Sequence, residues 1–288
     1  MLIDIAKGVK TQISSRVLNM EDMTEMALAA FFAGGHILLS RQVGLGKTEW
    51  AGALAQALGM TCKTERFYND FQPGGELHQG PVPTQIYMAE AVGYAHPRVQ
   101  TIISEAMDRT NKTNKKSASD CPITEPLFII ATYDEALPDF LCDRFMLKMT
   151  VPYPGIAAEK QLLQMHHAGI APDPAPLPVC NLEAIVQAKE EVCAVAVEDS
   201  IFNLIISIAE TTRRIGAVKT GVSPRGSIAL MTASKAYAAL QGRDYVMADD
   251  VKALAIPVLS HRIRLKPDAL KEGVQAEHII EGILNGRK

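Results

Sequence analysis

The feature that most constrains the fold is a glycine-bearing segment between an apolar strand and a helix. The run His36-Ile37-Leu38-Leu39-Ser40 is short and apolar, which is typical of a buried strand. The segment Gly44-Leu45-Gly46-Lys47-Thr48 follows it, and residues 48–58 have helical character. A strand, a loop and a helix in this order predict the opening of a βαβ unit, and therefore a parallel sheet covered by helices.

This loop carries the residue types that bind phosphate groups. Glycines allow positive φ and a close approach of the backbone to a ligand. The N–H groups of such a loop and of the helix that follows form an anion site. The lysine adds positive charge for the β and γ phosphates, and the threonine hydroxyl reaches Mg²⁺. We therefore predict that one segment binds ATP or ADP, formed by Gly44, Leu45, Gly46, Lys47, Thr48 and Glu49.

The loop departs from the full pattern G-x-x-x-x-G-K-[ST] at its start, where Arg41 stands in place of glycine. A chance Gly-Lys-Thr in a surface loop is the alternative interpretation. The apolar strand before the loop and the helix after it favour phosphate binding, because the motif works only in that context. Trp50, one turn into the helix, is expected to lie in the core.

The rest of the chain divides into two parts. Strands are predicted at 85–89, 127–132 and 146–151, and helices at 21–32 and 98–109, which together give an α/β domain over residues 1–155. Prolines at 172, 174, 176 and 178 favour extended backbone, and residues 156–175 are assigned to a linker. Helical patterns at 182–192, 200–214, 227–240, 248–256 and 276–284 then predict a helical domain over residues 176–288.

The bulk composition narrows the classes of partner. The formal net charge is −3 and the sequence pI is near 6.2, so nucleic acid is not an expected partner. The sequence has no apolar run of the roughly 20 residues that a membrane span needs, and no leader-like N-terminus. Five cysteines without a Cys-x-x-Cys pair are read as free thiols. We therefore expect a cytoplasmic protein without a membrane span.

Several segments in order resemble the MoxR family of AAA+ ATPases, over nearly the whole chain. Each segment is weakly specific alone, and the order and spacing make the likeness strong. The matching segments are Ala29 to Thr48, Gly80-Pro81-Val82, Ser104-Glu105-Ala106-Met107, Asp143-Arg144-Phe145, Ser223-Pro224-Arg225, Gly242-Arg243-Asp244-Tyr245-Val246 and Ser260-His261-Arg262.

The resemblance implies a P-loop AAA+ α/β domain of three layers with a parallel sheet, followed by a small all-helical lid domain. It implies an ATP-driven ring, usually a hexamer, built from the chain itself or with related AAA+ subunits, with nucleotide between neighbours. Such proteins act as chaperones that remodel or activate a partner protein, often together with a protein that carries a von Willebrand factor A domain. The sequence does not name the client protein.

The family ends its second acidic strand with an Asp-Glu pair, in which the aspartate orients Mg²⁺ and the glutamate polarises the attacking water. Counting from Gly80-Pro81-Val82 puts Glu90 at the aspartate and Ala91 at the glutamate. The resemblance therefore makes Glu90 a metal-side residue together with Thr48, and the position of the catalytic base holds a methyl group. Two alternatives stay open. In a shifted register Ala89 and Glu90 form the pair and Glu90 is catalytic, or Ala91 is an engineered replacement.

The resemblance assigns three further residues to catalysis. Asp134 stands where the family usually has a polar sensor asparagine, and an aspartate there adds repulsion toward a γ-phosphate. Arg144 matches an arginine that reaches the nucleotide of the neighbouring subunit. Arg225 matches a second sensor that ties the lid to the γ-phosphate. The alternative for each arginine alone is a surface salt bridge.

Three functions are compatible with these residues. The first is an ATP-hydrolysing remodeller, which Arg144 and Arg225 favour. The second is a hydrolysis-deficient scaffold subunit of a ring, which Arg41, Ala91 and Asp134 favour. The third, a DNA-processing AAA+ motor, is disfavoured by the acidic charge balance. We predict an ATP-binding ring protein with slow hydrolysis.

Overall fold

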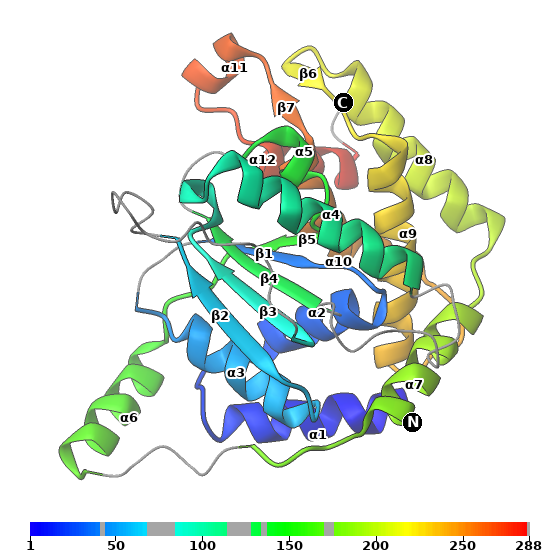
Figure 1. Cartoon of the computed structure of the whole chain (residues 1–288). Helices are drawn as coiled ribbons and strands as arrows, with labels where there is room; N and C mark the ends of the chain where they lie inside the picture. The colour runs from blue at the N-terminus through cyan, green and yellow to red at the C-terminus, as the bar shows by residue number, and fades with distance from the viewer. Residues whose placement is uncertain (41–43, 68–83, 114–127, 134–136, 170–175, 287–288) are drawn as a thin grey trace.

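The computed structural model describes residues 1–40, 44–67, 84–113, 128–133, 137–169 and 176–286. Its centre is a five-stranded sheet in the order β2-β3-β4-β1-β5, in which all neighbouring strands are parallel. Figure 1 shows helices on both faces of this sheet, with the helices that follow residue 176 mainly along the right and the top of the view. The predicted α/β domain with a parallel sheet is thereby confirmed.

The strands are β1 (Ile37–Ser40), β2 (Cys62–Arg66), β3 (Ile86–Glu90), β4 (Phe128–Tyr133) and β5 (Leu147–Met149). Because they are parallel, the carboxyl ends of β1, β3 and β4 lie at the same edge of the sheet. Ile37, the first residue of β1, pairs with Ile130 on one side and Leu147 on the other. The sequence does not predict β2, because this edge strand reads Cys-Lys-Thr-Glu-Arg and lacks an apolar run.

Alternate strand residues point to opposite faces of the sheet, and each face has its own helices. One face packs against α1 (Leu2–Ser14), α2 (Glu21–Phe32) and α3 (Lys47–Ala57), and it contributes Ile37, Leu39, Ile86, Met88, Phe128 and Ile130. The other face packs against η1 (Val92–Tyr94), α4 (Pro97–Thr113) and α5 (Asp139–Cys142), and it contributes Leu38, Tyr87, Ala89, Ile129 and Ala131.

The C-terminal half is a helical lid, as predicted, with one addition. Its helices are α7 (Leu182–Ala194), α8 (Asp199–Arg214), α9 (Pro224–Leu240), α10 (Ala248–Leu259), η3 (Ser260–Arg262), α11 (Pro267–Lys271) and α12 (Ala276–Leu284). The expectation of an all-helical domain is wrong in one respect, because β6 (Val218–Thr220) and β7 (Arg264–Leu265) form a two-stranded antiparallel sheet. Strands of three and two residues are too short to show a period of two in the sequence.

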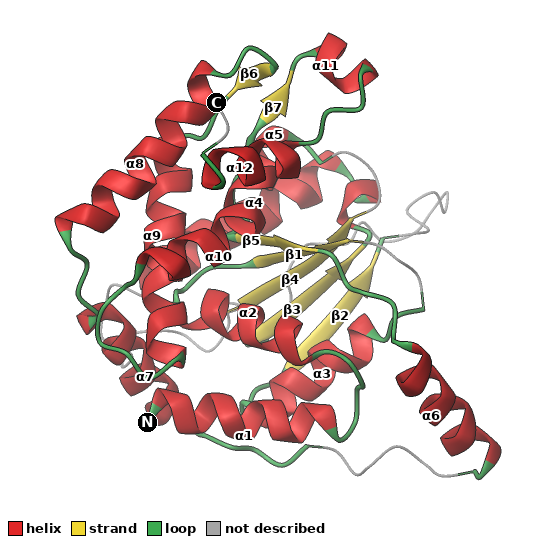
Figure 2. Cartoon of the chain, turned by 180° about the vertical axis from the view of Figure 1, so that it is seen from behind, coloured by secondary structure: helices red, strands yellow, loops and turns green. Residues whose placement is uncertain are grey.

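A helix occupies most of the segment that the sequence assigns to a linker. This helix, α6 (Ile156–His167), buries none of its side chains. It projects away from the body in both views, at the end of the molecule far from α8 and α9 (Figures 1 and 2). The extended backbone predicted from the prolines comes after it, around Pro176 and Pro178, while Pro172 and Pro174 lie outside the described residues.

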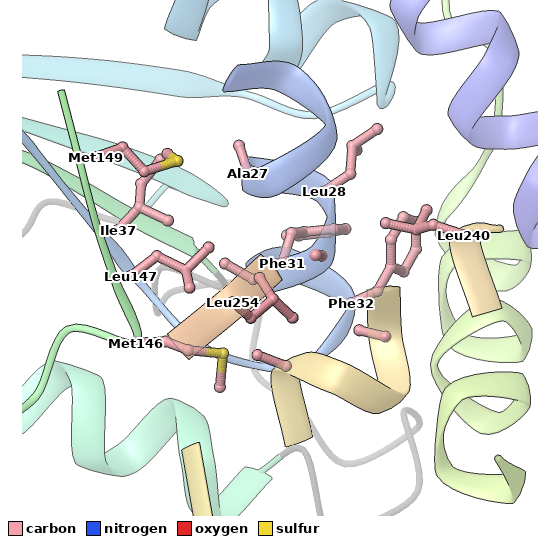
Figure 3. Packing of buried hydrophobic residues seen from close by; sticks show 14 of the residues in the cluster. Ala27, Leu28, Phe31, Phe32, Ile37, Met146, Leu147, Met149, Leu240 and Leu254 are labelled. Carbon is pink, nitrogen blue, oxygen red and sulfur yellow. The ribbon is translucent and has the colours of Figure 1, made fainter. Parts of the chain in front are cut away.

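One hydrophobic core continues from the sheet into the lid. Phe31 and Phe32 of α2 contact the same cluster as Leu240 of α9 and Leu254 of α10 (Figure 3). The rings of Phe31 and Phe32 meet edge to face at 5.0 Å between centroids. The predicted bounds 1–155 and 176–288 therefore separate two kinds of secondary structure that share one interior.

Candidate functional site

The phosphate loop is described from Gly44 onward, and Arg41 lies outside the described residues. Gly44 has a φ of 82° and Gly46 a φ of 71°, both in the left-handed region that glycine adopts without a Cβ clash. Gly46 is the residue before α3, and its carbonyl accepts the N–H of Trp50 at 2.8 Å. The first N–H groups of α3 follow the loop directly, and the N–H groups of a helix's first turn point out of the helix at its N-terminus. This local geometry fits a phosphate group.

The helix behind the loop is anchored to the core. Trp50 is fully buried, as expected, and its indole N–H donates to the Thr24 hydroxyl at 3.0 Å. At the other side of the same turn, Glu49 accepts from the guanidinium of Arg16 at 3.1 Å. Glu49 was predicted among the nucleotide-binding residues, and its side chain is used in this exposed ion pair. The anchoring fixes the direction in which α3 presents its N-terminus.

Thr48 and Glu90 meet at the carboxyl edge of the sheet. Glu90 is the last residue of β3 and only 7% exposed, and one of its carboxylate oxygens accepts the Thr48 hydroxyl. The other oxygen accepts Nε of Arg66 at 2.8 Å. Strand pairing brings Arg66 there, because it lies opposite Glu90 in the β2–β3 register and the Phe67 N–H donates to the Glu90 carbonyl at 3.1 Å. The two residues predicted on the metal side are thus brought together.

Ala91 follows Glu90 with an unusual backbone. Its φ of 58° and ψ of 44° are left-handed, and the residue is fully buried. Its N–H donates to the Thr132 hydroxyl at 2.9 Å, so β4 holds the turn in place. Ala89, by contrast, is an interior residue of β3 on the α4 face. The contact of Glu90 with Thr48 favours the register in which Glu90 is the metal-side carboxylate.

Two other sequence features cannot be placed. Asp134 directly follows β4 and lies outside the described residues, as does Gly80-Pro81-Val82. Within the described part of the chain, no group of three or more His, Cys, Asp or Glu residues could hold a metal ion by itself. A Mg²⁺ ion at Thr48 and Glu90 would fit its usual protein chemistry, in which one or two protein ligands act together with nucleotide phosphates.

Arg144 and Arg225 lie together at the opposite edge of the sheet. Arg144 precedes β5, whose first residue pairs with the first residue of β1, so this edge is the amino edge. Arg144 forms an ion pair with Asp108 of α4. Burial, and then the charge of Arg225, lower the pKa of the Arg144 guanidinium. Arg225, at the start of α9, donates to Asp143 at 3.2 Å.

A buried arginine that the sequence does not single out organises this amino edge. Arg262 donates to Asp143 at 2.7 Å and to the Phe145 and Val258 carbonyls at 2.7 and 2.9 Å. Burial lowers its pKa and the charge of Asp143 opposes that shift. The sequence shows Arg262 only within a family-like segment. Its role depends on contacts between the lid and the sheet, which lie more than a hundred positions apart.

Two buried histidines belong to the same edge. His36, just before β1, accepts the Ile129 N–H at Nδ1 at 3.1 Å, and burial lowers its pKa to about 4. His261 places Nε2 at 3.0 Å from the Phe145 carbonyl, and burial followed by the charge of Arg262 lowers its pKa to about 3. Both rings are therefore neutral at physiological pH and serve as fixed hydrogen-bonding groups.

The comparisons with known proteins agree with this architecture. The AAA lid domain family matches residues 210–283. The chain is 34% identical to the protein YeaC of Bacillus subtilis, over 99% of this chain and 94% of that protein. It is 24% identical to Chaperone MoxR1 of Mycobacterium tuberculosis, over 95% of this chain and 79% of that protein. A crystal structure of a candidate ATPase from Cytophaga hutchinsonii superposes with a TM-score of 0.85 at 25% identity, and covers 99% of this chain and 94% of that one.

The parallel sheet, the left-handed glycines before α3 and the helical lid define a AAA+ ATPase module. The chain belongs to the MoxR family of AAA+ ATPases. In the described part of the chain, the helices are all too short or too polar to cross a membrane.

Proposed function

We propose that this chain binds ATP with Mg²⁺ at the phosphate-loop edge and assembles into a ring, usually a hexamer in such proteins, that remodels or activates a partner protein. The observation that carries the proposal is the contact of Thr48 with Glu90 beside the left-handed glycines at the start of α3. Family membership supports the ATPase class, and the name of the relative Chaperone MoxR1 supports a client protein. A von Willebrand factor A protein is a candidate partner, and a cytoplasmic location stays a prediction.

The chain's own groups have separate tasks in this proposal. The backbone of Gly44, Leu45 and Gly46 and the N-terminus of α3 would hold the phosphates. Lys47 would place its charge on the β and γ phosphates, while Thr48 and Glu90 would hold Mg²⁺. The metal, when bound, supplies neutralisation of phosphate charge. Asp134 would lie close to the γ-phosphate as a sensor.

The opposite placement of the two arginines supports a site shared between subunits. Arg144 and Arg225 gather at the amino edge, whereas the phosphate loop leaves the carboxyl edge of the same sheet. An arginine at one edge can serve a nucleotide at the other edge only in a neighbouring copy. A head-to-tail contact of this kind closes into a ring when its rotation allows. We therefore assign both arginines to the neighbour's nucleotide, so that Arg225 would tie its lid to the γ-phosphate bound by the neighbouring subunit.

A more specific part of the proposal is that the chain hydrolyses ATP slowly. The position after Glu90 carries a buried methyl group, and a methyl group cannot polarise an attacking water. This observation favours the second candidate, a ring scaffold in which the nucleotide is structural or regulatory. A DNA-processing motor has no comparable support from the described residues.

The test combines nucleotide-dependent thermal stabilisation with steady-state ATP hydrolysis by the purified full chain. ADP with Mg²⁺ at about 100 times its dissociation constant should stabilise the wild type by about 2.7 kcal/mol. Lys47→Ala should abolish that stabilisation, since it removes the cation of the phosphate loop. Lys63→Ala, an exposed lysine on β2, serves as the matched control and should respond like the wild type.

The same thermal-stabilisation assay distinguishes residues at the carboxyl edge of the sheet from residues at the amino edge. At protein concentrations too low for ring assembly, Arg144→Ala should keep the full ADP-dependent stabilisation, because Arg144 lies at the opposite edge from its own phosphate loop. A Lys47→Ala variant that is stabilised like the wild type would contradict nucleotide binding at this loop. Robust turnover by the pure wild-type chain would contradict slow hydrolysis, whereas turnover equal to that of Lys47→Ala would support the scaffold.

A further inference from the structure

Arg66 is a charged residue at the candidate metal site, and the phosphate-loop motif gives it no role. Its Nε lies 2.8 Å from one oxygen of Glu90, and the other oxygen of the same carboxylate accepts the Thr48 hydroxyl. A single carboxylate group therefore separates the guanidinium from the proposed Mg²⁺ ligand Thr48. The Glu90 side chain is 9% exposed, whereas the Arg66 side chain is 62% exposed.

The position of Arg66 is fixed by the sheet. Arg66 is the last residue of edge strand β2, in register with Glu90, the last residue of β3. The backbone bond from Phe67 to the Glu90 carbonyl extends this pairing beyond the strand ends, and the Phe67 side chain is fully buried. The backbone under Arg66 is thus held, while its cationic end stays in solvent at the carboxyl edge where the phosphate loop begins.

We propose that Arg66 is a resident cation of the nucleotide site, which occupies Glu90 in place of Mg²⁺ when the metal is absent. The inference rests on the proposed nucleotide binding at Gly44 to Thr48. It makes Arg66 a positioning residue for Glu90 and a source of positive charge for the polyphosphate of ATP or ADP. Nucleotide binding in this chain is then less dependent on Mg²⁺ than Thr48 and Glu90 alone would make it.

The charges give this inference two consequences of opposite sign. Without metal, Arg66 balances Glu90 and reduces the repulsion between that carboxylate and the phosphates. With metal, two cations share one carboxylate, so the guanidinium opposes the ion. Removing the charge at position 66 should therefore weaken metal-free nucleotide binding and at the same time strengthen Mg²⁺ binding. A merely structural role would weaken both.

The experiment measures ADP binding to the full chain by calorimetry, first in EDTA and then at fixed ADP with increasing Mg²⁺. Arg66→Gln should weaken ADP binding in EDTA and lower the half-saturating Mg²⁺ concentration, each by roughly three- to tenfold, as one unit charge a few ångströms away at an exposed site predicts. Arg66→Lys keeps the charge and should stay close to the wild type. Lys63→Gln removes an exposed charge from the same strand and should change neither value.

The outcomes separate this inference from the proposed function. If the wild type binds ADP and Arg66→Gln behaves like Lys63→Gln, Arg66 is not a resident cation and the nucleotide site stands. If Arg66→Gln weakens ADP binding in EDTA and Mg²⁺ binding alike, the opposition between the two cations is wrong. If the wild type and Lys47→Ala both fail to bind ADP, the proposed function and this inference fall together.

Discussion

The two edges of the central sheet are built in different ways. At the carboxyl edge, two left-handed glycines, the start of α3 and the Thr48–Glu90 contact form an exposed loop that rests on a single anchored helix. At the amino edge, the buried guanidinium of Arg262 joins Asp143, the turn at Phe145 and the lid into one hydrogen-bonded network. The difference indicates that the first edge is shaped to receive a ligand, while the second holds the lid rigidly against the sheet.

The largest expected effect on the free energy of unfolding comes from a substitution at the amino edge. Arg262→Ala removes a buried guanidinium and leaves the Phe145 and Val258 carbonyls without this donor, while Asp143 keeps its ion pair with Arg225. The free energy of unfolding should therefore fall by about 2 to 4 kcal/mol, since each buried acceptor that loses its donor costs about 1 to 3 kcal/mol. Chemical denaturation monitored by circular dichroism measures the change. Lys47→Ala, at the carboxyl edge, is the reference and should unfold close to the wild type without nucleotide. Equal stability of the wild type and Arg262→Ala would contradict a stabilising role of Arg262 between the lid and the sheet.

Acid should loosen the same edge selectively. His36 and His261 have folded pKa values of about 4 and about 3, below their ordinary value of 6.5, so the unfolded chain binds protons more readily. Stability is therefore fully present well above pH 6.5 and is lost as the pH falls, by roughly 2 to 3 kcal/mol for each histidine near pH 4.5. His261→Gln, which cannot take up the proton, should remove about half of this loss in unfolding curves recorded between these two pH values. An unchanged pH dependence in His261→Gln would show that its ring titrates normally.

The smallest stability effect belongs to the carboxyl edge. Gly46→Ala forces a side chain into the left-handed region, which costs about 1 to 2 kcal/mol, and open space around the loop limits further strain because the nearest atom to an added Cβ lies 3.8 Å away on Val17. The variant should therefore fold, yet lose most of the ADP-dependent thermal shift. Gly52→Ala in the middle of α3 is the control, since an added Cβ there meets no atom within 4 Å. Normal ADP binding by Gly46→Ala would mean that the left-handed turn is not needed for the ligand.

Sequence periodicity predicts the long elements of this fold because their apolar faces meet one continuous core. The strand at residues 85–89 and the helix at 248–256 appear within a few residues of their observed bounds, as β3 and α10. The polar edge strand β2 and the short strands β6 and β7 lack such a face. Their pairing depends on partners elsewhere in the chain.

The residues of the candidate site also divide into those that local sequence pattern predicts and those that it does not. Thr48 and Glu90 belong to motifs, so the sequence predicts both before their contact is known. Arg66 reaches the site only through the β2–β3 register, and Arg262 only through packing of the lid, so neither could be found from local pattern. Asp134 stays a prediction, because it lies outside the described residues.

Helix α6 has a consequence for how this sequence can change over evolutionary time. Its 12 residues bury no side chain, and an isolated helix shorter than roughly 12 to 15 residues is barely stable in water. Folding of the subunit therefore places almost no selection on these positions. Two of them nevertheless carry large apolar side chains in solvent, since Ile156 is 90% and Leu163 67% exposed. A lineage selected for folding alone would drift to polar residues here. Exposed apolar residues that persist in α6 would therefore indicate selection by contacts outside the subunit.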